Sequence, residues 1–276
     1  MEVYPTLMSS QQETILDYLE LVPADDPGLS FLEELITAYT RRVPWESAFR
    51  IVKRGNTSSL ADCPRWPDEF WTDAMEKGGG GTCFESNYAF LALLTGLGYR
   101  GYLTINNMGD SVGCHAAIVL KIGGYQWLAD VGLPVYTPLP VNTHEITYCS
   151  SRFHRYTVMP EGAMRFRIDR DRHPLPTCYT LINRPVSDAQ FRQATMNDYG
   201  PEGHFLDQVI VTKVIGEHVW RFNSGERPYH LERFKDGKKG SQSLPEDERE
   251  RAEAVGQRFS IDEDMIYAGL QLTRSA

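Results

Sequence analysis

The sequence lacks the patterns that predict secretion, disulfide bonding or a membrane span. Its five cysteines, at positions 63, 83, 114, 149 and 178, are odd in number and form no C-x-x-C pair, so we expect free thiols. Residues 1–10 contain no basic segment followed by an apolar run, so no signal peptide is expected. The longest apolar run, near residues 88–94, is far too short to cross a bilayer. We therefore expect a cytoplasmic protein with no membrane partner.

Positive charge is also scarce. Lysine and arginine total 28 against 37 aspartates and glutamates, which gives a formal net charge of −9. An acidic chain repels the phosphate backbone of nucleic acids unless its basic residues gather on one face. The arginine-rich segment at 165–172 is interrupted by aspartates and is typical of a solvated surface segment. We expect no nucleic-acid partner.

Motifs for metals, nucleotides and serine hydrolases are absent. The sequence has no HExxH, HxH, GxSxG, Walker-type or dinucleotide-binding pattern. Cys114 and His115 are neighbours, but adjacent residues of a strand point to opposite faces and do not readily share one ion. The glycine-rich segment at 77–82 lacks the Lys-Ser/Thr of a phosphate-binding loop. We therefore predict no metal site.

The patterns that are present predict an α+β fold. The chain has 276 residues, 41% of them hydrophobic, which is enough for a sizeable core. Predicted helices cover residues 11–21, a segment that begins at Ser30 as its cap with Glu33 three residues on, residues 84–95 and residues 245–258. Predicted strands cover 102–105, 116–122, 125–131, 155–158 and 179–182, with a later hairpin of 205–214 and 218–223. Residues 231–243 are polar and predict a surface loop.

Cys83 is the strongest candidate for a nucleophile. It follows four glycines and Thr82 and precedes the predicted helix at 84–95. Backbone N–H groups and the helix dipole at such a position favour an anion, so a thiolate is stabilised there. The glycines allow the chain to approach a ligand closely. The alternative is an inert buried thiol behind a flexible loop.

His115 and Asp130 are the candidate partners of this cysteine. Gly123-Gly124 predicts a two-residue turn between the strands 116–122 and 125–131, so Ile122 pairs with Tyr125. In that register His115 and Asp130 are diagonal neighbours on the same sheet face. A carboxylate that orients an imidazole beside a thiol is the arrangement of a cysteine triad. A lone histidine is more often structural, but an aspartate within an apolar strand needs a partner.

Four segments of the chain resemble the arylamine N-acetyltransferases. Residues 42–47 (RVPWES) are similar to the family's V-P-F-E-N segment, and residues 80–87 (GGTCFESN) match G-G-x-C-x-E-x-N. The strand after His115 and the segment 127–132 (WLADVG) are similar to the family's histidine strand and its D-V-G-F-G segment. Residues 201–205 (PEGHF) resemble its P-x-S-x-F lid segment, and residues 250–261 its terminal helix.

The resemblance implies a fold in three parts, related to the papain-like and transglutaminase-like cysteine enzymes. An N-terminal helical bundle, residues 1–98, would carry Cys83. A central β-barrel, residues 99–190, would carry His115 and Asp130, and a C-terminal α/β lid would cover residues 191–276. The implied activity is ping-pong acyl transfer from coenzyme A through a Cys83 thioester to an arylamine, hydrazine or N-hydroxyarylamine.

The resemblance also implies the binding partners and their contacts. No permanently bound cofactor is expected; acetyl-CoA or another acyl-CoA is the donor, and an aromatic amine is the acceptor. The residues so assigned are Trp45, Gly132 and Val135 for the acceptor, and Gly113, Cys114, Pro201 and Phe205 for coenzyme A.

The chain departs from the family pattern at several positions. Gly79 stands where the family has an arginine, and Lys77 or Arg42 is the expected substitute in an ion pair with Glu46. Pro134 replaces a glycine and removes a backbone N–H donor. Four further departures lie near the expected pockets: Trp45 for phenylalanine, Ser47 for asparagine, Ala194 for asparagine and Met196 for tyrosine.

Three other functions are compatible with these residues. The same triad serves an amide synthase that closes a lactam from a carrier-bound acyl chain, and it serves a cysteine protease or amidase. The third is a binding protein that keeps a relic triad without activity.

Overall fold

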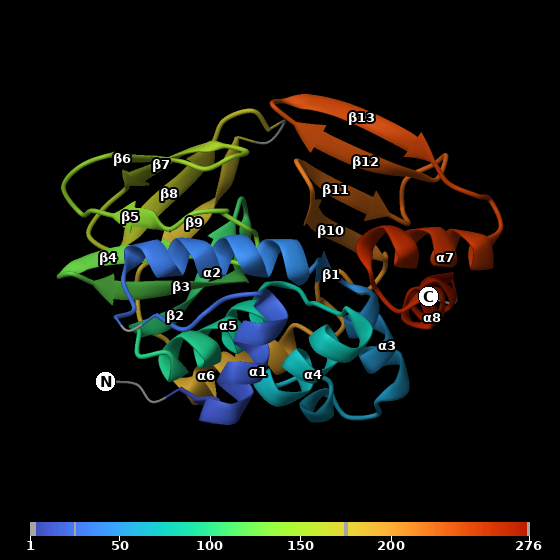
Figure 1. Ribbon diagram of the computed structural model, residues 1–276, viewed down its shortest axis with the longest axis horizontal. Coiled ribbons are helices and arrows are strands. Elements are labelled where there is room, and N and C mark those ends of the chain that lie inside the picture. The colour runs from blue at the N-terminus through green and yellow to red at the C-terminus, as the bar shows by residue number, and fades with distance from the viewer. Residues whose placement is uncertain (1–3, 25, 174–175, 275–276) are drawn as a thin grey trace.

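The computed structural model describes residues 4–24, 26–173 and 176–274. The ends of the predicted first and third parts, residues 1–3 and 275–276, lie outside the described residues. Helices form a layer beneath two β-sheets, which stand side by side above it (Figure 1). The predicted α+β fold, with a helical bundle, a barrel and a further α/β part, is confirmed.

The N-terminal segment is helical, as predicted. Its elements are α1 (Ser9–Leu19), α2 (Leu29–Arg42), β1 (Trp45–Glu46), α3 (Ala48–Asn56), the short 3₁₀ helix η1 (Leu60–Asp62), α4 (Pro67–Lys77) and α5 (Cys83–Gly96). The prediction that Ser30 caps the second helix is wrong: Gly28 is the N-cap, and its carbonyl accepts the N–H of Leu32 at 3.2 Å. Helix α5 is buried from Cys83 to Leu94, which explains why residues 88–94 are apolar on every side of the helix.

The first sheet has eight strands and curls into a barrel-like shape. Its strands are β2 (Arg100–Met108), β3 (Ser111–Ile122), β4 (Tyr125–Ala129), β5 (Leu139–Val141), β6 (Thr147–Ser150), β7 (Arg155–Pro160), β8 (Arg165–Arg170) and β9 (Thr177–Ile182). They are arranged in the order β5-β4-β3-β2-β9-β8-β7-β6, and the end strands β5 and β6 contact each other. The predicted register of the β3–β4 hairpin is confirmed, because Ile122 pairs with Tyr125.

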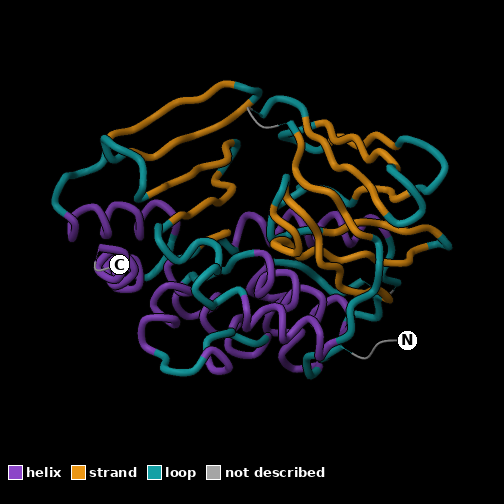
Figure 2. The backbone as a smooth tube through the Cα atoms, turned by 180° about the vertical axis from the view of Figure 1, so that it is seen from behind, coloured by secondary structure: helices purple, strands orange, loops and turns teal. Residues whose placement is uncertain are grey.

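The second sheet is built from both halves of the chain. After α6 (Asp188–Asn197) come β10 (Ile210–Ile215), β11 (His218–Asn223), β12 (His230–Lys235) and β13 (Lys238–Ser243), followed by α7 (Glu248–Phe259) and α8 (Glu263–Arg274). The short strand β1 joins this sheet beside β10, with Trp45 opposite Thr212. This pairing brings the segment before the glycine run against the C-terminal part of the chain, and β1 and β10 are neighbours in Figure 1. Seen from behind, the two sheets again stand above most of the helices (Figure 2).

The predicted surface loop at 231–243 is wrong. These residues form most of the β12–β13 hairpin, which turns at Asp236 and Gly237. Strand β13 is the edge of the sheet, and nearly all of its residues are exposed. An edge strand of this kind carries charged and polar residues, which protect it from pairing with other chains but hide the alternation that marks a strand.

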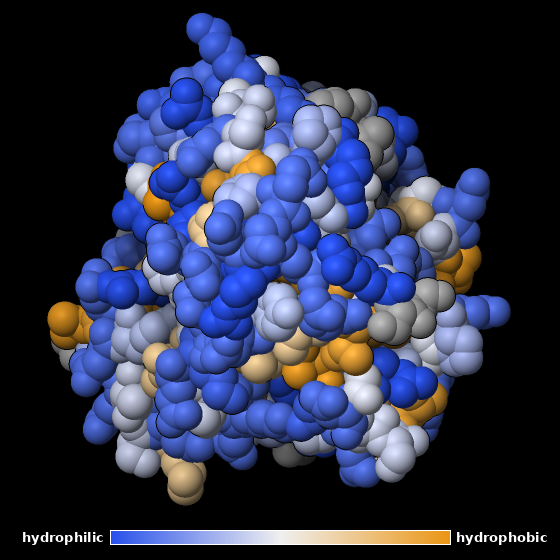
Figure 3. All heavy atoms as spheres, turned by 90° about the vertical axis from the view of Figure 1, so that its right-hand side faces the viewer, coloured by the Kyte–Doolittle hydropathy of each residue, from blue (hydrophilic) through white to orange (hydrophobic). Residues whose placement is uncertain are grey.

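Two apolar cores hold these elements together. The first joins α1, α2, α4 and α5 to the barrel, with Leu35, Phe90 and Ile118 among its fully buried members. The second joins α3 to the second sheet and to α7 and α8. The face formed by the C-terminal elements is mostly hydrophilic, with small separate apolar areas (Figure 3). Domain boundaries at 98 and 190 remain predictions.

Within the described residues, no helix combines the length and the apolar composition that crossing a bilayer requires.

Candidate active site

Cys83 is the first residue of α5, and Thr82 is the N-cap of that helix. The sulfur therefore lies at the positive end of the helix dipole. The side chain is 5% exposed, and Sγ lies 3.7 Å from the carbonyl oxygen of Cys114 on β3. The predicted position of this cysteine at a helix start is confirmed.

Two glycines bring the backbone close to this cysteine. A Cβ on Gly132 would lie 2.7 Å from Cys83 Cβ and 2.6 Å from Asn87 Nδ2, far inside contact distance. A Cβ on Gly80 would overlap with the backbone of Pro44. Both positions therefore exclude a side chain, and the loop after β4 packs directly on the nucleophile's helix.

His115 and Asp130 form a direct contact. His115 Nε2 lies 2.7 Å from Asp130 Oδ2, and the two residues are 2% and 0% exposed. The prediction that the two side chains meet is confirmed, but Asp130 lies just after β4 and not within a strand that continues to residue 131. The ring of Tyr179, on β9, packs against the imidazole with 4.4 Å between the ring centres.

The second oxygen of Asp130 accepts three hydrogen bonds. Its donors are Asn87 Nδ2 at 3.0 Å, the N–H of Gly132 at 2.9 Å and the N–H of Leu133 at 3.0 Å. These donors hold the carboxylate in one orientation, so Oδ2 faces the imidazole. An oriented carboxylate of this kind fixes the tautomer and the position of a catalytic histidine.

Asn87, on the helix of Cys83, hydrogen-bonds to the segments that carry His115 and Asp130. It was assigned no role from the sequence. Besides Asp130 it contacts the carbonyl of Ala116 at 2.8 Å and accepts the N–H of Val131 at 3.1 Å. It lies one helical turn after Cys83, so its side chain shares a helix face with the nucleophile. That spacing was the signal that sequence reasoning could have used.

The charges around His115 favour its protonated form. Burial of the ring lowers its pKa, but the negative charges of Asp130 and Cys83, together with hydrogen bonds to both, raise the pKa of His115 to about 10. The folded-state pKa is therefore above that of the free ring. The pair contributes to stability fully below about pH 6.5, and this contribution is lost as the pH rises through about 10.

This pKa shift predicts how Cys83 reacts with iodoacetamide. Because His115 stays charged at neutral and mildly acidic pH, we expect Cys83 to be alkylated faster at about pH 6 in the parent protein than in His115→Gln. The measurement is the pH dependence of alkylation followed by mass spectrometry, with His115→Gln as the comparison. An alkylation rate at Cys83 that is the same in the parent protein and in His115→Gln across this pH range contradicts the prediction.

Arg65 supplies the buried positive charge that we expected from Lys77 or Arg42. Its guanidinium lies 2.7 Å from a carboxylate oxygen of Glu85 and 3.8 Å from one of Glu46, and it donates to the Gly80 carbonyl at 2.6 Å. Lys77 is exposed and pairs with Asp73, and Arg42 pairs with Glu20, so that expectation is wrong. Arg65 comes from a proline- and tryptophan-rich loop, where no local pattern marks it.

The surroundings of Gly79 leave no room for an arginine side chain at that position, and the positive charge beside Glu46 comes from Arg65 instead. A Cβ at this position would lie 2.8 Å from the ring of Phe49, so the space that a side chain would need is filled. The Arg65 guanidinium lies 5.1 Å from the centre of the same ring. Arg65 thereby fixes both the glycine run and the first turn of α5, the two segments that flank Cys83.

Replacing Arg65 is expected to destabilise the fold. The Arg65→Met variant leaves the carboxylates of Glu85 and Glu46 buried without their cation, which costs about 3–5 kcal/mol of unfolding free energy. Lys77→Met, which removes only an exposed partner of Asp73, is expected to cost less than about 1 kcal/mol. Urea unfolding of both variants measures the difference. Equal losses in the two variants would show that Arg65 has no special role.

A second buried arginine, Arg50, binds the loop between α6 and β10. Arg50 is 0% exposed and pairs with Asp198 at 2.7 Å, while its Nε donates to the His204 carbonyl at 3.1 Å. The same loop contains Phe205, whose ring packs edge-on against Trp45 with 4.9 Å between the ring centres. The backbone of Trp45 forms an isolated bridge with Gly81, next to the nucleophile's helix.

The structure brings most of the predicted binding residues to this region. Trp45, Gly132, Cys114 and Phe205 lie in the contacts described above. Gly113 adopts a φ of 71° beside Cys114, and the N–H of Val135 donates to the Asp130 carbonyl at 3.1 Å. Pro201 is exposed in the loop between α6 and β10, outside these contacts.

One group of side chains in the described residues has the composition of a metal site, and it lies on the second sheet. Glu226, His230 and Glu232 place potential ligand atoms within 4.8 Å of one another. Arg221 binds both carboxylates, at 2.8 and 2.9 Å, and Lys239 also contacts Glu232. The carboxylates are therefore already paired with cations, and the group is an ion-pair network.

Comparison with known proteins identifies the family of this fold and site. A family model described as N-acetyltransferase matches residues 28–265. A search of curated protein sequences finds no match.

Solved structures give the same result. Arylamine N-acetyltransferase from Mycobacterium marinum has a TM-score of 0.79 at 18% identity, over 95% of this chain and 98% of that one. The enzyme from Salmonella typhimurium also has a TM-score of 0.79, at 17% identity over 96% and 99%. The enzyme from Bacillus cereus, described as having a Cys-His-Glu triad, has a TM-score of 0.73 at 18% identity over 92% and 100%. The chain therefore belongs to the arylamine N-acetyltransferase family.

Proposed function

We propose that this acetyltransferase moves an acyl group from coenzyme A to an aromatic amine through a thioester on Cys83. The observation that carries the proposal is the buried line of contacts from Cys83 through His115 to Asp130. It supplies a nucleophile, a proton carrier and a group that orients the carrier. Acetyl-CoA is the donor that the family implies.

In the first half-reaction Cys83 rests as a thiolate beside the imidazolium of His115. The sulfur attacks the thioester carbonyl, and the bond between that carbon and the sulfur of coenzyme A breaks. His115 protonates the departing thiolate, so free coenzyme A leaves and the acyl group remains on Cys83. Asp130 keeps the imidazole in position through both events.

In the second half-reaction the neutral imidazole acts as a base. The acceptor nitrogen attacks the Cys83 thioester while His115 takes its proton, and the bond between the acyl carbon and Cys83 breaks. The amide leaves, and the thiolate and imidazolium are restored. No metal or redox partner is needed to balance either step.

Two features support these substrate classes. The edge-on pair of Trp45 and Phe205 stands beside the glycine run that precedes Cys83, where it can pack against a flat aromatic acceptor. The Mycobacterium marinum enzyme, which shares the fold, has also been crystallised in complex with CoA. The Bacillus cereus relative is described with a glutamate in its triad, whereas Asp130 takes that place in the present proposal.

The mass of the protein after exposure to acyl-CoA thioesters tests the proposal. We expect one acetyl group on Cys83 after incubation with acetyl-CoA and its discharge when an arylamine is added. An acyl-enzyme that no amine discharges points to another acceptor, as in an amide synthase. A reactive Cys83 that acetyl-CoA never labels contradicts acyl-CoA transfer and favours a carrier-bound donor or a hydrolase.

A further inference from the structure

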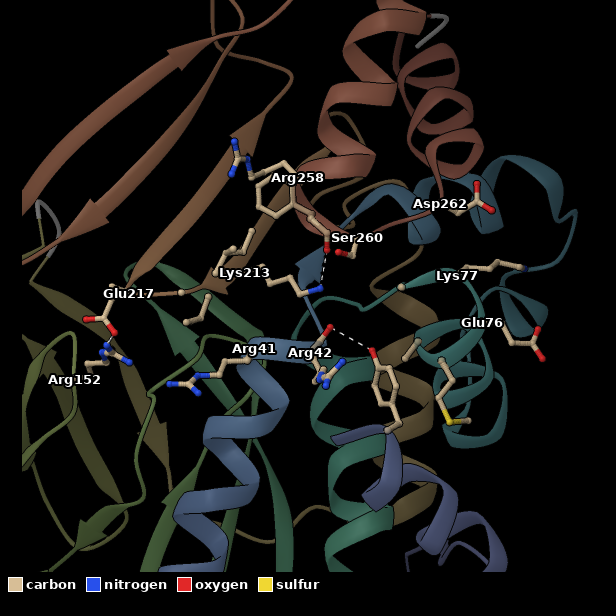
Figure 4. Close-up of a pocket in the computed structure, with 18 residues that line it drawn as sticks. Arg41, Arg42, Glu76, Lys77, Arg152, Lys213, Glu217, Arg258, Ser260 and Asp262 are labelled. Carbon is tan, nitrogen blue, oxygen red and sulfur yellow. Dashed lines mark hydrogen bonds and ion pairs between the residues drawn. The ribbon is translucent and has the colours of Figure 1, made fainter. Parts of the chain in front are cut away.

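A large cavity lies apart from Cys83, His115 and Asp130. It has a volume of about 810 Å³ and is formed where the ends of α2, α4 and α7 meet the β10–β11 turn (Figure 4). None of the three candidate catalytic residues lines it. Its walls come from segments far apart in the sequence, so it is a feature of the folded chain only.

The charge of this cavity is opposite to that of the whole protein. Its lining contains six basic residues and three acidic ones, whereas the chain has a net charge of −9. The acidic residue Glu217 forms an ion pair with Arg152 and a second one with Lys235, at 3.3 Å. Asp262 accepts the N–H groups of Asp264 and Met265 at the start of α8. Glu217 pairs with Arg152, Glu20 with Arg42 and Asp73 with Lys77, so Lys213, Arg41 and Arg258 are the lining cations without a carboxylate partner among the described residues.

Lys213 is the most unusual of these basic groups. Its side chain is only 8% exposed, and among the described residues no carboxylate lies within ion-pair distance of its ammonium group. The ammonium donates to the carbonyl of Phe259, the last residue of α7, at 2.7 Å. This hydrogen bond satisfies a carbonyl at the C-terminal end of α7. The carbonyl carries only a partial negative charge, however, and it accepts only one of the three N–H groups of the Lys213 ammonium.

The nearby charges make an anion favourable at this point. Burial and the positive charge of Arg42 lower the pKa of Lys213 to about 8. In Figure 4 the nitrogen of Lys213 lies between Arg42 and the end of α7. Arg41 also lines the cavity and makes no ion pair or hydrogen bond with another described residue. Arg42 pairs with Glu20, but Lys213 and Arg41 have no carboxylate partner among the described residues, and a cavity with such an excess of positive charge favours a bound anion.

We propose that this cavity is a binding site for a small organic phosphate, held by Lys213, Arg41 and Arg42. Two arginines and a lysine suit a phosphate group, which carries more negative charge than a carboxylate and accepts paired hydrogen bonds from guanidinium groups. The volume exceeds that of a bare phosphate ion, so the cavity also holds the organic part of the ligand. The phosphate belongs either to the nucleotide of the acyl-CoA donor or to a separate phosphorylated metabolite. The site stands on its own contacts and does not depend on the chemistry proposed for Cys83.

Calorimetric titration of the full chain with inorganic pyrophosphate tests the site. We expect saturable binding that weakens with added salt and is reduced at least about tenfold in Lys213→Met and in Arg41→Ala. Lys121→Met, which removes an exposed lysine of β3 outside the cavity, should bind like the parent protein. Because Arg41 is exposed, we expect Arg41→Ala to fold. This variant therefore tests the site even if Lys213→Met does not fold. No saturable binding, or equal binding by the parent protein and both cavity variants, overturns the proposal.

The source of the phosphate is decided by steady-state kinetics with acetyl-CoA in the presence of pyrophosphate. An increase in the KM for acetyl-CoA in the parent protein, absent in Arg41→Ala, assigns the cavity to the donor's nucleotide. Unchanged kinetics at saturating pyrophosphate assigns it to a separate phosphorylated metabolite. Because binding is measured without turnover, an inactive Cys83 leaves the result on the cavity unaffected.

Discussion

The Cys83→Ala variant is expected to lose acyl transfer completely while keeping its fold. The change removes a single sulfur atom from a side chain that lies at the start of α5, so the packing around it changes little. Without the sulfur there is no atom to carry the acyl group, and His115 has no proton to exchange with a nucleophile. Mass spectrometry after incubation with acetyl-CoA measures the acyl-enzyme, and circular dichroism checks the fold.

Cys149→Ala is the matched control for this variant. Cys149 lies on β6, outside the candidate site, and its Sγ contacts the carbonyl of Pro138. We expect acyl-enzyme formation to persist in Cys149→Ala. If Cys83→Ala still forms a thioester or turns over, the nucleophile is another residue and the proposed mechanism is wrong.

The Asp130→Asn variant is expected to lower kcat by about four orders of magnitude, the size of the effect that the same change has in a serine triad. The substituted amide must turn its oxygen toward the donors Asn87, Gly132 and Leu133, because these N–H groups face Oδ1. Its NH₂ group then faces His115 Nε2, which has to accept a hydrogen bond instead of donating one. The ring is thereby held in the wrong tautomer, and the imidazolium loses its counter-charge.

Asp188→Asn provides the control for this second prediction. Asp188 is also an aspartate with a side-chain partner, Arg192 at 3.0 Å, but it lies on α6 and contacts neither Cys83 nor His115. We expect its kcat to stay close to that of the parent protein. The pH dependence of kcat separates the roles further: Asp130→Asn should shift the His115 titration downward. Full activity in Asp130→Asn would restrict Asp130 to a structural role.

The hairpin that carries His115 and Asp130 was predictable because its register depends on local features. Gly123-Gly124 closes a two-residue turn, and a turn of this length fixes which residues on either side pair. The pairing of Ile122 with Tyr125 follows from these short-range effects. The position of Cys83 at a helix start was predictable for the same reason, since glycines and Thr82 precede a continuous apolar segment.

The β12–β13 hairpin was missed because an edge strand lacks a buried face. Residues 238–243 are polar and mostly exposed, so neither periodicity nor composition separates them from a loop. Their strand conformation depends on hydrogen bonds to β12, which itself pairs with β11. Such partners are supplied by the sheet, and no window of sequence contains them.

Local sequence accounts for the nucleophile, its helix and the His115–Asp130 hairpin, because each depends on residues that are close in the chain. The partners of the buried arginines could be identified only from the three-dimensional structure. Arg65 reaches Glu46 and Glu85 across 19 and 20 positions, and Arg50 reaches Asp198 across 148. A buried charge is stabilised by whichever opposite charge the packed elements bring within a few ångströms. The sequence suggested Lys77 or Arg42 as the partner of Glu46, whereas the fold brings Arg65 to the two glutamates.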